Sequence, residues 1–143
     1  MPQTSTQPTF LPLTTAASRS AAESRNEPPV RAAAQVVLRR AAEADVSAAD
    51  CWVALLANCD SPGARQLPGR LRALTEAAAI YAGSSWWQGE GSYLRRRLAE
   101  AQHQLVEAIG DGDGQGFAGA FVSYDQAVAT TVVAVQSRLG SPA

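Results

Sequence analysis

Residues 117–139, FAGAFVSYDQAVATTVVAVQSRL, carry the most regular apolar pattern in the chain. The apolar side chains recur at spacings of 4, 3, 4, 4, 3 and 4 residues: Phe117, Phe121, Tyr124, Val128, Val132, Val135 and Leu139. This spacing is typical of one face of an α-helix. Val133 beside Val132 widens the apolar face, so we expect this helix to pack on several other helices or on another chain.

The segment before it has the same period. Its stripe is Leu94, Leu98, Ala101, Leu105 and Ile109. Gly110 ends this second helix, and the sequence DGDGQG at 111–116 connects it to the first. Because a short loop between two helices favours antiparallel packing, we predict a C-terminal antiparallel helical hairpin.

Upstream segments also indicate helices. Pro28 and Pro29 suit a first helical turn, where backbone N–H groups need no intrahelical partner. Ser47 and Asp50 resemble a capping box, which predicts that a second helix starts there and contains CWVALLANC at 51–59.

A third upstream helix is predicted from about Pro68 to Ala82, after the turn DSPG at 60–63. We find no strand alternation and no internal repeat. The predicted fold is therefore all-α, with about five helices in a small bundle that forms a helical domain over residues 28–140.

Residues 1–27 differ from the rest of the chain. They are rich in Thr, Ser, Gln and Pro and show no helical or strand period. Such a composition buries too little apolar surface to offset the entropy of ordering. We therefore predict an extended N-terminal arm that is flexible alone or bound to a partner, with Phe10, Leu11 and Leu13 as its anchors.

Charge and cysteine content restrict the partners and the compartment. Twelve basic residues face 13 acidic ones in 143 residues, and the net charge is -1, which argues against nucleic-acid binding. No run approaches 18 apolar residues, so no membrane span is predicted. Cys51 and Cys59 lie too far apart on one helix for a disulfide, and we expect free thiols in a reducing, cytoplasmic compartment.

Catalytic and metal-binding patterns are weak. His103 is the only histidine, and it lies off the Leu98–Leu105 stripe, although a dyad with Cys51 or Cys59 stays open. The DGDGQG loop resembles the start of a calcium-binding EF-hand, but Val122 stands where that loop needs a bidentate glutamate. We predict no enzyme activity, no catalytic residue, no metal site and no cofactor.

The stretch SSWWQGEGSYLRRRLAE at 84–100 holds adjacent tryptophans. Neighbouring residues on a helix point about 100° apart, so one tryptophan should pack inward and the other should stay partly exposed. Partly exposed tryptophans are common interface anchors. We therefore name Trp86 and Trp87 as candidate partner-binding residues.

Trp87, Gln88 and Gly89 also match the W-x-G motif of the WXG100 family, small helical-hairpin proteins exported by type VII secretion. The motif lies between two helices there, as it does in the fold predicted here. The resemblance implies a secreted helical dimer without catalytic residues. The chain departs from the family in its length and in its extra N-terminal helices.

The leading expectation is a non-enzymatic interaction or assembly subunit of a larger protein complex, in homo- or hetero-oligomeric contact with other protein subunits. Its docking elements would be the helical hairpin face and the N-terminal arm. The alternatives are a helical bundle that binds an apolar small molecule, a helix-turn-helix DNA-binding regulator and a WXG100-like secreted protein.

Overall fold

Six α-helices and no strand make up residues 9–140, the part of the chain that the computed structural model describes. They are α1 (Pro12–Ala22), α2 (Pro28–Ala57), α3 (Pro62–Ala82), α4 (Ser84–Gln88), α5 (Ser92–Asp111) and α6 (Gly114–Gly140). The prediction of an all-α fold is confirmed.

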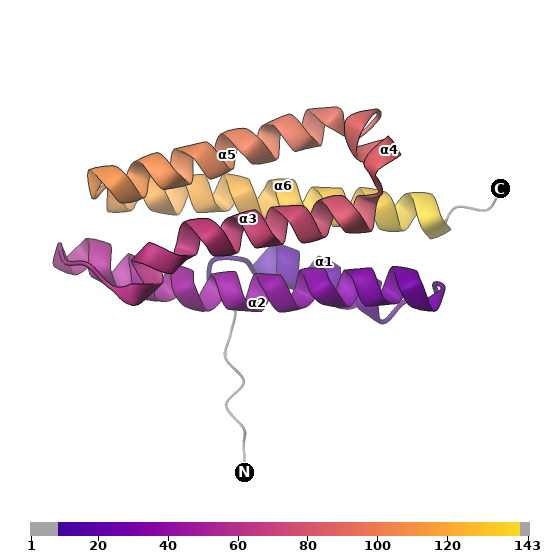
Figure 1. Ribbon diagram of the computed structural model, residues 1–143, viewed down its shortest axis with the longest axis horizontal. Helices are drawn as coiled ribbons and strands as arrows, with labels where there is room; N and C mark the ends of the chain where they lie inside the picture. The colour runs from indigo at the N-terminus through magenta and orange to yellow at the C-terminus, as the bar shows by residue number, and fades with distance from the viewer. Residues whose placement is uncertain (1–8, 141–143) are drawn as a thin grey trace, which may run out of the picture.

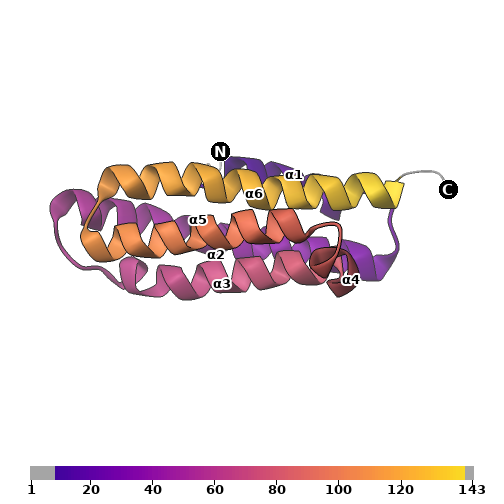
Figure 2. The ribbon, with the colours of Figure 1, turned by 90° about the horizontal axis from the view of Figure 1, so that it is seen from above.

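The four long helices run along one common axis (Figure 1). α2 packs on α3, α5 packs on α6, and the short α1 lies against both α2 and α6. Seen from above, α6 and α1 lie along one edge of the molecule, while α3 and α4 lie along the opposite edge (Figure 2). This arrangement makes α1 and α6 neighbours on a single outer side.

The core runs the length of the long helices. The apolar stripes predicted for α5 and α6 provide much of it, because Leu94, Leu98, Leu105, Phe117, Phe121, Tyr124, Val128, Val132 and Val135 are at most 1% exposed. Leu67, Leu71 and Leu74 of α3 face them and are fully buried. At the end of α6 the stripe reaches the surface, and Leu139 is 39% exposed.

The N-terminal region differs from the predicted extended arm. Residues 12–22 form α1, and the preceding Leu11 is fully buried in this chain's own core. The N-terminus of α1 has no cap from its own sequence, and remote side chains cap it instead, as described below. Local sequence patterns do not contain that information. Residues 1–8 of the predicted arm lie outside the described residues.

The predicted break at Ser47 is absent. α2 continues without interruption from Pro28 to Ala57. Ser47 is 4% exposed inside the helix, and Asp50 accepts a hydrogen bond from the backbone N–H of Gly63 at 2.8 Å instead of capping its own helix. The helices predicted from Pro28 and from Ser47 therefore form the single helix α2. Burial of its face against α3 stabilises the helix more than the capping pattern at Ser47 favours a break.

Other helices also begin at residues that differ from those predicted from the sequence. α3 begins at Pro62, because the Ser61 hydroxyl accepts from the Ala64 N–H at 3.0 Å, and Pro68 lies inside the helix. The buried neighbours Leu67 and Leu71 hold the chain helical across Pro68. α4 is a separate turn of helix. Because α1 and α4 are added and two predicted helices are joined in α2, the described residues contain six helices where the sequence predicted about five.

α5 and α6 are joined by Gly112 and Asp113 and lie side by side in opposite directions (Figures 1 and 2). Gly112 adopts a left-handed conformation with φ of 67°. The carboxylate of Asp113 accepts from the Gly116 N–H at 2.9 Å and caps α6. The DGDGQG sequence thus forms a turn and a helix cap.

One described helix, α6 over Gly114–Leu139, is long and apolar enough to cross a membrane by length and composition. However, 56% of its most apolar window is buried against the other helices. Core helices of soluble proteins pass the same test, so this property alone does not assign α6 to a membrane.

Candidate functional site

The outer side formed by α1 and α6 has an unusual lack of charge. Between Gly114 and Ser137 the only charged residue of α6 is Asp125, and its side chain is 4% exposed. Three large apolar side chains on this side are at least half exposed: Leu13 (50%), Val122 (58%) and Val133 (51%). We define the α1/α6 face as Leu13, Ala16, Ala17, Val122, Gln126, Ala129, Thr130 and Val133.

Two hollows lie along the seam between α1 and α6. The larger, of about 560 Å³, is lined by Leu13, Ala16, Ala17, Gln126, Ala129, Thr130, Val133 and Ala134. The smaller, of about 340 Å³, includes Pro12, Leu13, Ala118 and Val122. Leu13 lines both, so it forms a ridge between two shallow depressions of mostly apolar character.

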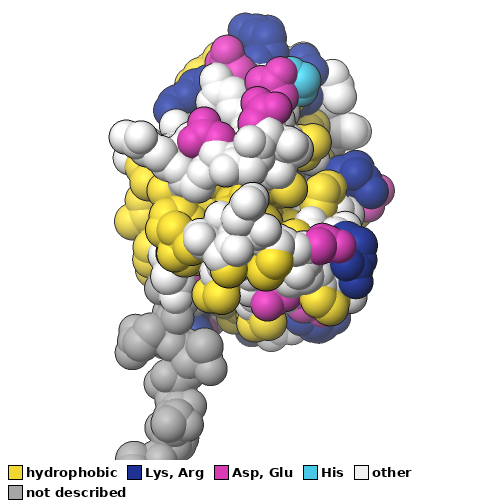
Figure 3. All heavy atoms as spheres, turned by 90° about the vertical axis from the view of Figure 1, so that its left-hand side faces the viewer, with side chains coloured by type: hydrophobic (Ala, Val, Ile, Leu, Met, Phe, Trp, Pro, Cys, Tyr) yellow, Lys and Arg dark blue, Asp and Glu magenta, His cyan; other side chains and the backbone are white. Residues whose placement is uncertain are grey.

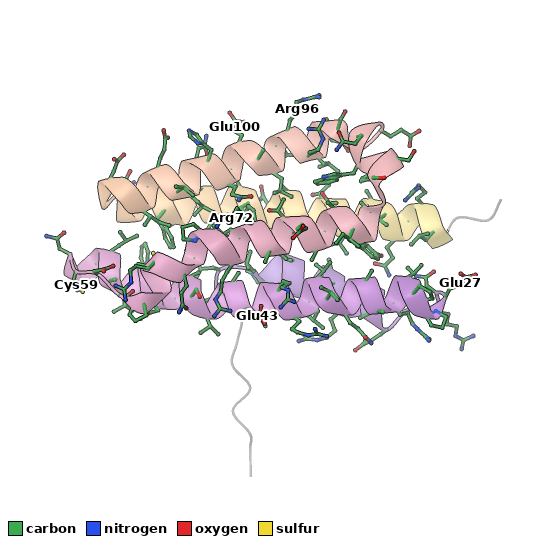
Figure 4. All side chains as sticks on the ribbon, viewed as in Figure 1. Glu27, Glu43, Cys59, Arg72, Arg96 and Glu100 are labelled. Atoms are coloured by element: carbon green, nitrogen blue, oxygen red, sulfur yellow. The ribbon has the colours of Figure 1, made fainter. Side chains whose placement is uncertain are left out.

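The other helices carry most of the surface charge, and α1 and α6 add the exposed Arg19 and Arg138. Arg96 and Glu100 project outward from α5, and Arg72 and Glu43 mark the charged surfaces of α3 and α2 (Figure 4). Viewed along the long axis, apolar side chains gather toward the left of the molecule, whereas most charged side chains lie at the top and the right (Figure 3).

Several of the charges on α2 and α3 are paired. Arg40 and Arg70 reach the carboxylate of Glu43 at 3.0 and 3.8 Å. These pairs place charges of both signs close together on the surfaces of α2 and α3.

Two buried carboxylates hold the segment that leads into α1. Asp45 of α2 accepts hydrogen bonds from the backbone N–H groups of Thr9, Phe10 and Leu11 at 3.1, 2.7 and 3.0 Å. Asp125 of α6 accepts from the N–H groups of Leu13 and Thr14 at 3.1 and 2.8 Å. These contacts place the N-terminus of α1 against α6 and so complete the α1/α6 face.

Phe10 anchors the same segment through aromatic contacts. Its ring centroid lies 6.1 Å from Trp52, 5.6 Å from Phe117 and 5.2 Å from Phe121. Phe10 and Leu11 are thus used inside this chain. Of the three residues predicted to anchor an arm on a partner, Leu13 is the one that the structure leaves half exposed.

The two tryptophans behave as their spacing predicts. Trp87 is buried, with 6% of its surface exposed, and Trp86 is partly exposed. The ring of Trp86 lies against Gly91, where an added Cβ would come within 2.5 Å of the ring, and the guanidinium of Arg138 sits 5.6 Å from its centroid. Trp86 therefore joins α4 to the end of α6, and its contact with a partner stays a prediction.

Cys51, Cys59 and His103, the residues suited to nucleophilic chemistry, are not brought together in one site. Burial, together with the nearby Asp50 carboxylate, raises the pKa of Cys51 from an ordinary value of 9.0 to about 11, which keeps it a thiol. Cys59 is exposed and lines a cleft of about 440 Å³ with Asp60 and Asp111, but His103 does not line that cleft. His103 is itself exposed, and its Nε2 lies 3.3 Å from the Glu107 carboxylate on the same helix.

The buried tyrosine of α6 is a structural group. The Tyr124 hydroxyl lies 2.9 Å from the Thr75 hydroxyl and donates to the Leu71 carbonyl at 3.1 Å. Burial raises the pKa of Tyr124 far above its ordinary value, so the hydroxyl stays protonated. Within residues 9–140, no group of three or more His, Cys, Asp or Glu side chains is placed to hold a metal ion.

No family model, no curated protein and no solved structure matches the chain. The resemblance to the WXG100 family thus extends no further than Trp87, Gln88 and Gly89. Val133 was expected from the sequence to widen the apolar face of this helix toward other helices or another chain, whereas Val122 was not recognised as a docking residue. The absence of exposed charge along α6 up to Ser137 is visible in the sequence.

Proposed function

We propose that the chain is a non-enzymatic interaction or assembly subunit that docks on other protein subunits through the α1/α6 face. In this proposal the helices form one small bundle, and α5 and α6 act as its C-terminal antiparallel hairpin. The observation that supports the proposal most is the long helix whose single charge before Arg138, that of Asp125, is buried.

The chemistry of the face fits a docking role. Charged residues are depleted at the cores of protein interfaces, whereas surfaces that stay in water usually mix charges of both signs. The surfaces of the other helices mix charges of both signs, whereas the α1/α6 face is depleted in charge, as an interface core is. Leu13, Val122 and Val133 supply apolar area, and Gln126 and Thr130 supply hydrogen-bonding groups within the face.

The area also suits an interface. A helix of 27 residues such as α6 is about 40 Å long, and a strip of about 10 Å along it offers about 400 Å². The 11 residues of α1 add about 150 Å² beside it. A docked partner would therefore bury about 1,100 Å² in total, which is enough for a specific but modest interface.

The separation of Cys51, Cys59 and His103 supports the non-enzymatic part of the proposal. A cytoplasmic location belongs to the same proposal, because the exposed Cys59 thiol is best preserved in a reducing compartment.

Site-specific photo-crosslinking in cells tests the docking face. A photoreactive amino acid replaces Val133 in one version and Val53, which is 62% exposed on α2, in the control. We expect discrete protein adducts from position 133 that disappear when Val122 is also changed to Glu, and no such adducts from position 53. Equal adducts from both positions, or none from position 133, would contradict the proposal.

A further inference from the structure

We infer that the occupant of the α1/α6 face is a second copy of this chain, with the two α6 helices antiparallel about a two-fold axis that passes near Ala127 and Val128. This inference rests on the proposed docking face and adds the identity of the partner and its register. Three properties of the face support it: its shape, its spacing and its charge.

The shape is self-complementary. Leu13 is a ridge beside the larger hollow, and it lies near Asp125 of α6, whose carboxylate its backbone N–H contacts at 3.1 Å. The larger hollow is centred on Gln126–Val133, a few residues further along α6. A two-fold axis near residues 127 and 128 therefore brings the Leu13 ridge of each copy onto the larger hollow of the other.

The spacing of the outward residues fits a second helix of the same kind. Beside the buried stripe, α6 has a second row at intervals of 4, 3, 4, 3 and 4 residues: Gln115, Gly119, Val122, Gln126, Ala129 and Val133. All of them are exposed except Ala129, which is 8% exposed. The intervals average about 3.6 residues, the period of a straight α-helix, so the row runs along one face of α6 and can meet the same row of a second copy.

The same axis pairs the two exposed valines of α6. Val122 and Val133 lie 11 residues apart, which is about 16 Å along the helix. They are equidistant from the point between Ala127 and Val128, so the antiparallel arrangement sets Val122 of each copy against Val133 of the other. The two large apolar side chains of the row thus meet each other, and the exposed Gly119 allows close approach.

The absence of charge favours a second copy in particular. In an isologous interface a patch meets itself, so any exposed charge near the axis would face a like charge. The α1/α6 face avoids this repulsion because Asp125 is turned inward and bound to the N–H groups of Leu13 and Thr14. Since the face offers a partner no charge to pair with, its own uncharged surface is the best match.

Analytical ultracentrifugation of the full chain from about 1 to 500 μM tests the inference. We expect a reversible monomer–dimer equilibrium, which an interface of this modest size would place in the micromolar range. Val122→Glu and Val133→Arg should each weaken dimerisation about 100-fold, because each sets a charge into an apolar contact. Val53→Glu on α2 is the matched control and should leave the equilibrium unchanged.

Mixing the two α6 variants tests the register. In a mixed dimer, one contact pairs the carboxylate introduced at position 122 with the guanidinium introduced at position 133, and the other contact keeps both native valines. An equimolar mixture should therefore regain a dissociation constant within a few-fold of that of the native chain. Circular dichroism of each variant checks that the helices are retained, since both positions are exposed.

Each outcome decides between the two proposals. A native chain that stays monomeric at 500 μM overturns the second-copy inference, and the crosslinking at position 133 then decides separately whether a different protein docks on the face. Weakening by Val53→Glu equal to that of the α6 variants also overturns the inference. A dimer that both variants disrupt but that their mixture does not restore overturns the antiparallel register.

Discussion

Asp45 on α2 and Asp125 on α6 accept hydrogen bonds from the backbone on either side of Pro12. Asp45 binds the N–H groups of residues 9–11, and Asp125 binds those of residues 13 and 14. Proline has no backbone N–H, so the two carboxylates together satisfy every backbone N–H group from residue 9 to residue 14. A segment that reads as disordered in sequence is thereby fixed on the bundle.

Replacing Asp125 by Ala should lower the free energy of unfolding by about 2–3 kcal/mol, because two buried or partly buried N–H groups lose a charged acceptor. Asp125→Asn, which keeps one acceptor oxygen, should cost less. Urea denaturation followed by circular dichroism measures both. Asp113→Ala, which removes an exposed cap at the start of α6, is the control and should cost about 1 kcal/mol. Equal losses for Asp125 and Asp113 would contradict the role given to Asp125.

The Tyr124 hydroxyl should contribute to stability through its two partners. Tyr124→Phe leaves the buried Leu71 carbonyl without that donor and should cost about 1–2 kcal/mol. A double-mutant cycle with Thr75→Val isolates the hydroxyl pair, because the two oxygens are 2.9 Å apart. We expect a coupling energy of about 0.5 kcal/mol or more. Strict additivity of the two substitutions would argue that the contact is energetically silent.

Two glycines of the α5 region should respond in opposite directions to alanine. Gly91→Ala places a methyl group within 2.5 Å of the Trp86 ring, so it should destabilise the chain by about 1–3 kcal/mol and change the tryptophan fluorescence. Gly110→Ala meets no atom within 4 Å in the last turns of α5 and should stabilise the chain by about 0.5–1 kcal/mol. Thermal unfolding with fluorescence detection compares them; a loss of the same size at both positions would contradict the packing of Trp86 on Gly91.

The parts of the fold that depend on periodicity could be predicted from the sequence. The stripes of Leu94–Ile109 and Phe117–Leu139 are regular enough to define α5 and α6, and Gly110 and the following glycines mark the loop between them. The inward Trp87 and the partly exposed Trp86 follow from helical geometry alone.

The parts that depend on distant residues could not be predicted. α1 has no cap of its own and is held by carboxylates 34 and 111 residues away along the chain. Ser47 and Asp50 match a capping box, yet the burial of α2 against α3 carries the helix through them. The outward row of α6 becomes a candidate surface only when the position of α1 is known, because Leu13 completes its hollows.

The fall of the free energy of unfolding at alkaline pH should depend on the Cys51 thiol. A thiol whose pKa is raised from 9.0 to about 11 in the folded state binds its proton more tightly there than in the unfolded chain. Its contribution is therefore complete below pH 9 and is lost as the pH rises toward 11, by at most about 2–3 kcal/mol. Unfolding free energies from about pH 8 to 10 should fall for the native chain and less steeply for Cys51→Ala. Parallel curves for the two proteins would contradict a buried, protonated Cys51.

Removal of the N-terminal segment separates a structural α1 from a dispensable arm. A chain that starts at Glu23 lacks Phe10, Leu11 and all of α1, so it exposes the aromatic cluster of Trp52, Phe117 and Phe121 and leaves the carboxylates of Asp45 and Asp125 without their backbone donors. Loss of the buried Leu11 side chain alone should cost about 2–5 kcal/mol, and the unpaired carboxylates add to that cost. We expect the chain that starts at Glu23 to melt at least about 10 °C lower than the full-length protein or to fail to fold. A chain that starts at Thr9 keeps Phe10, Leu11 and α1 and is the control. Its melting temperature should be close to that of the full-length protein. Because a flexible arm would add nothing to the core, equal melting temperatures for the two shortened chains would restore the prediction made from the sequence.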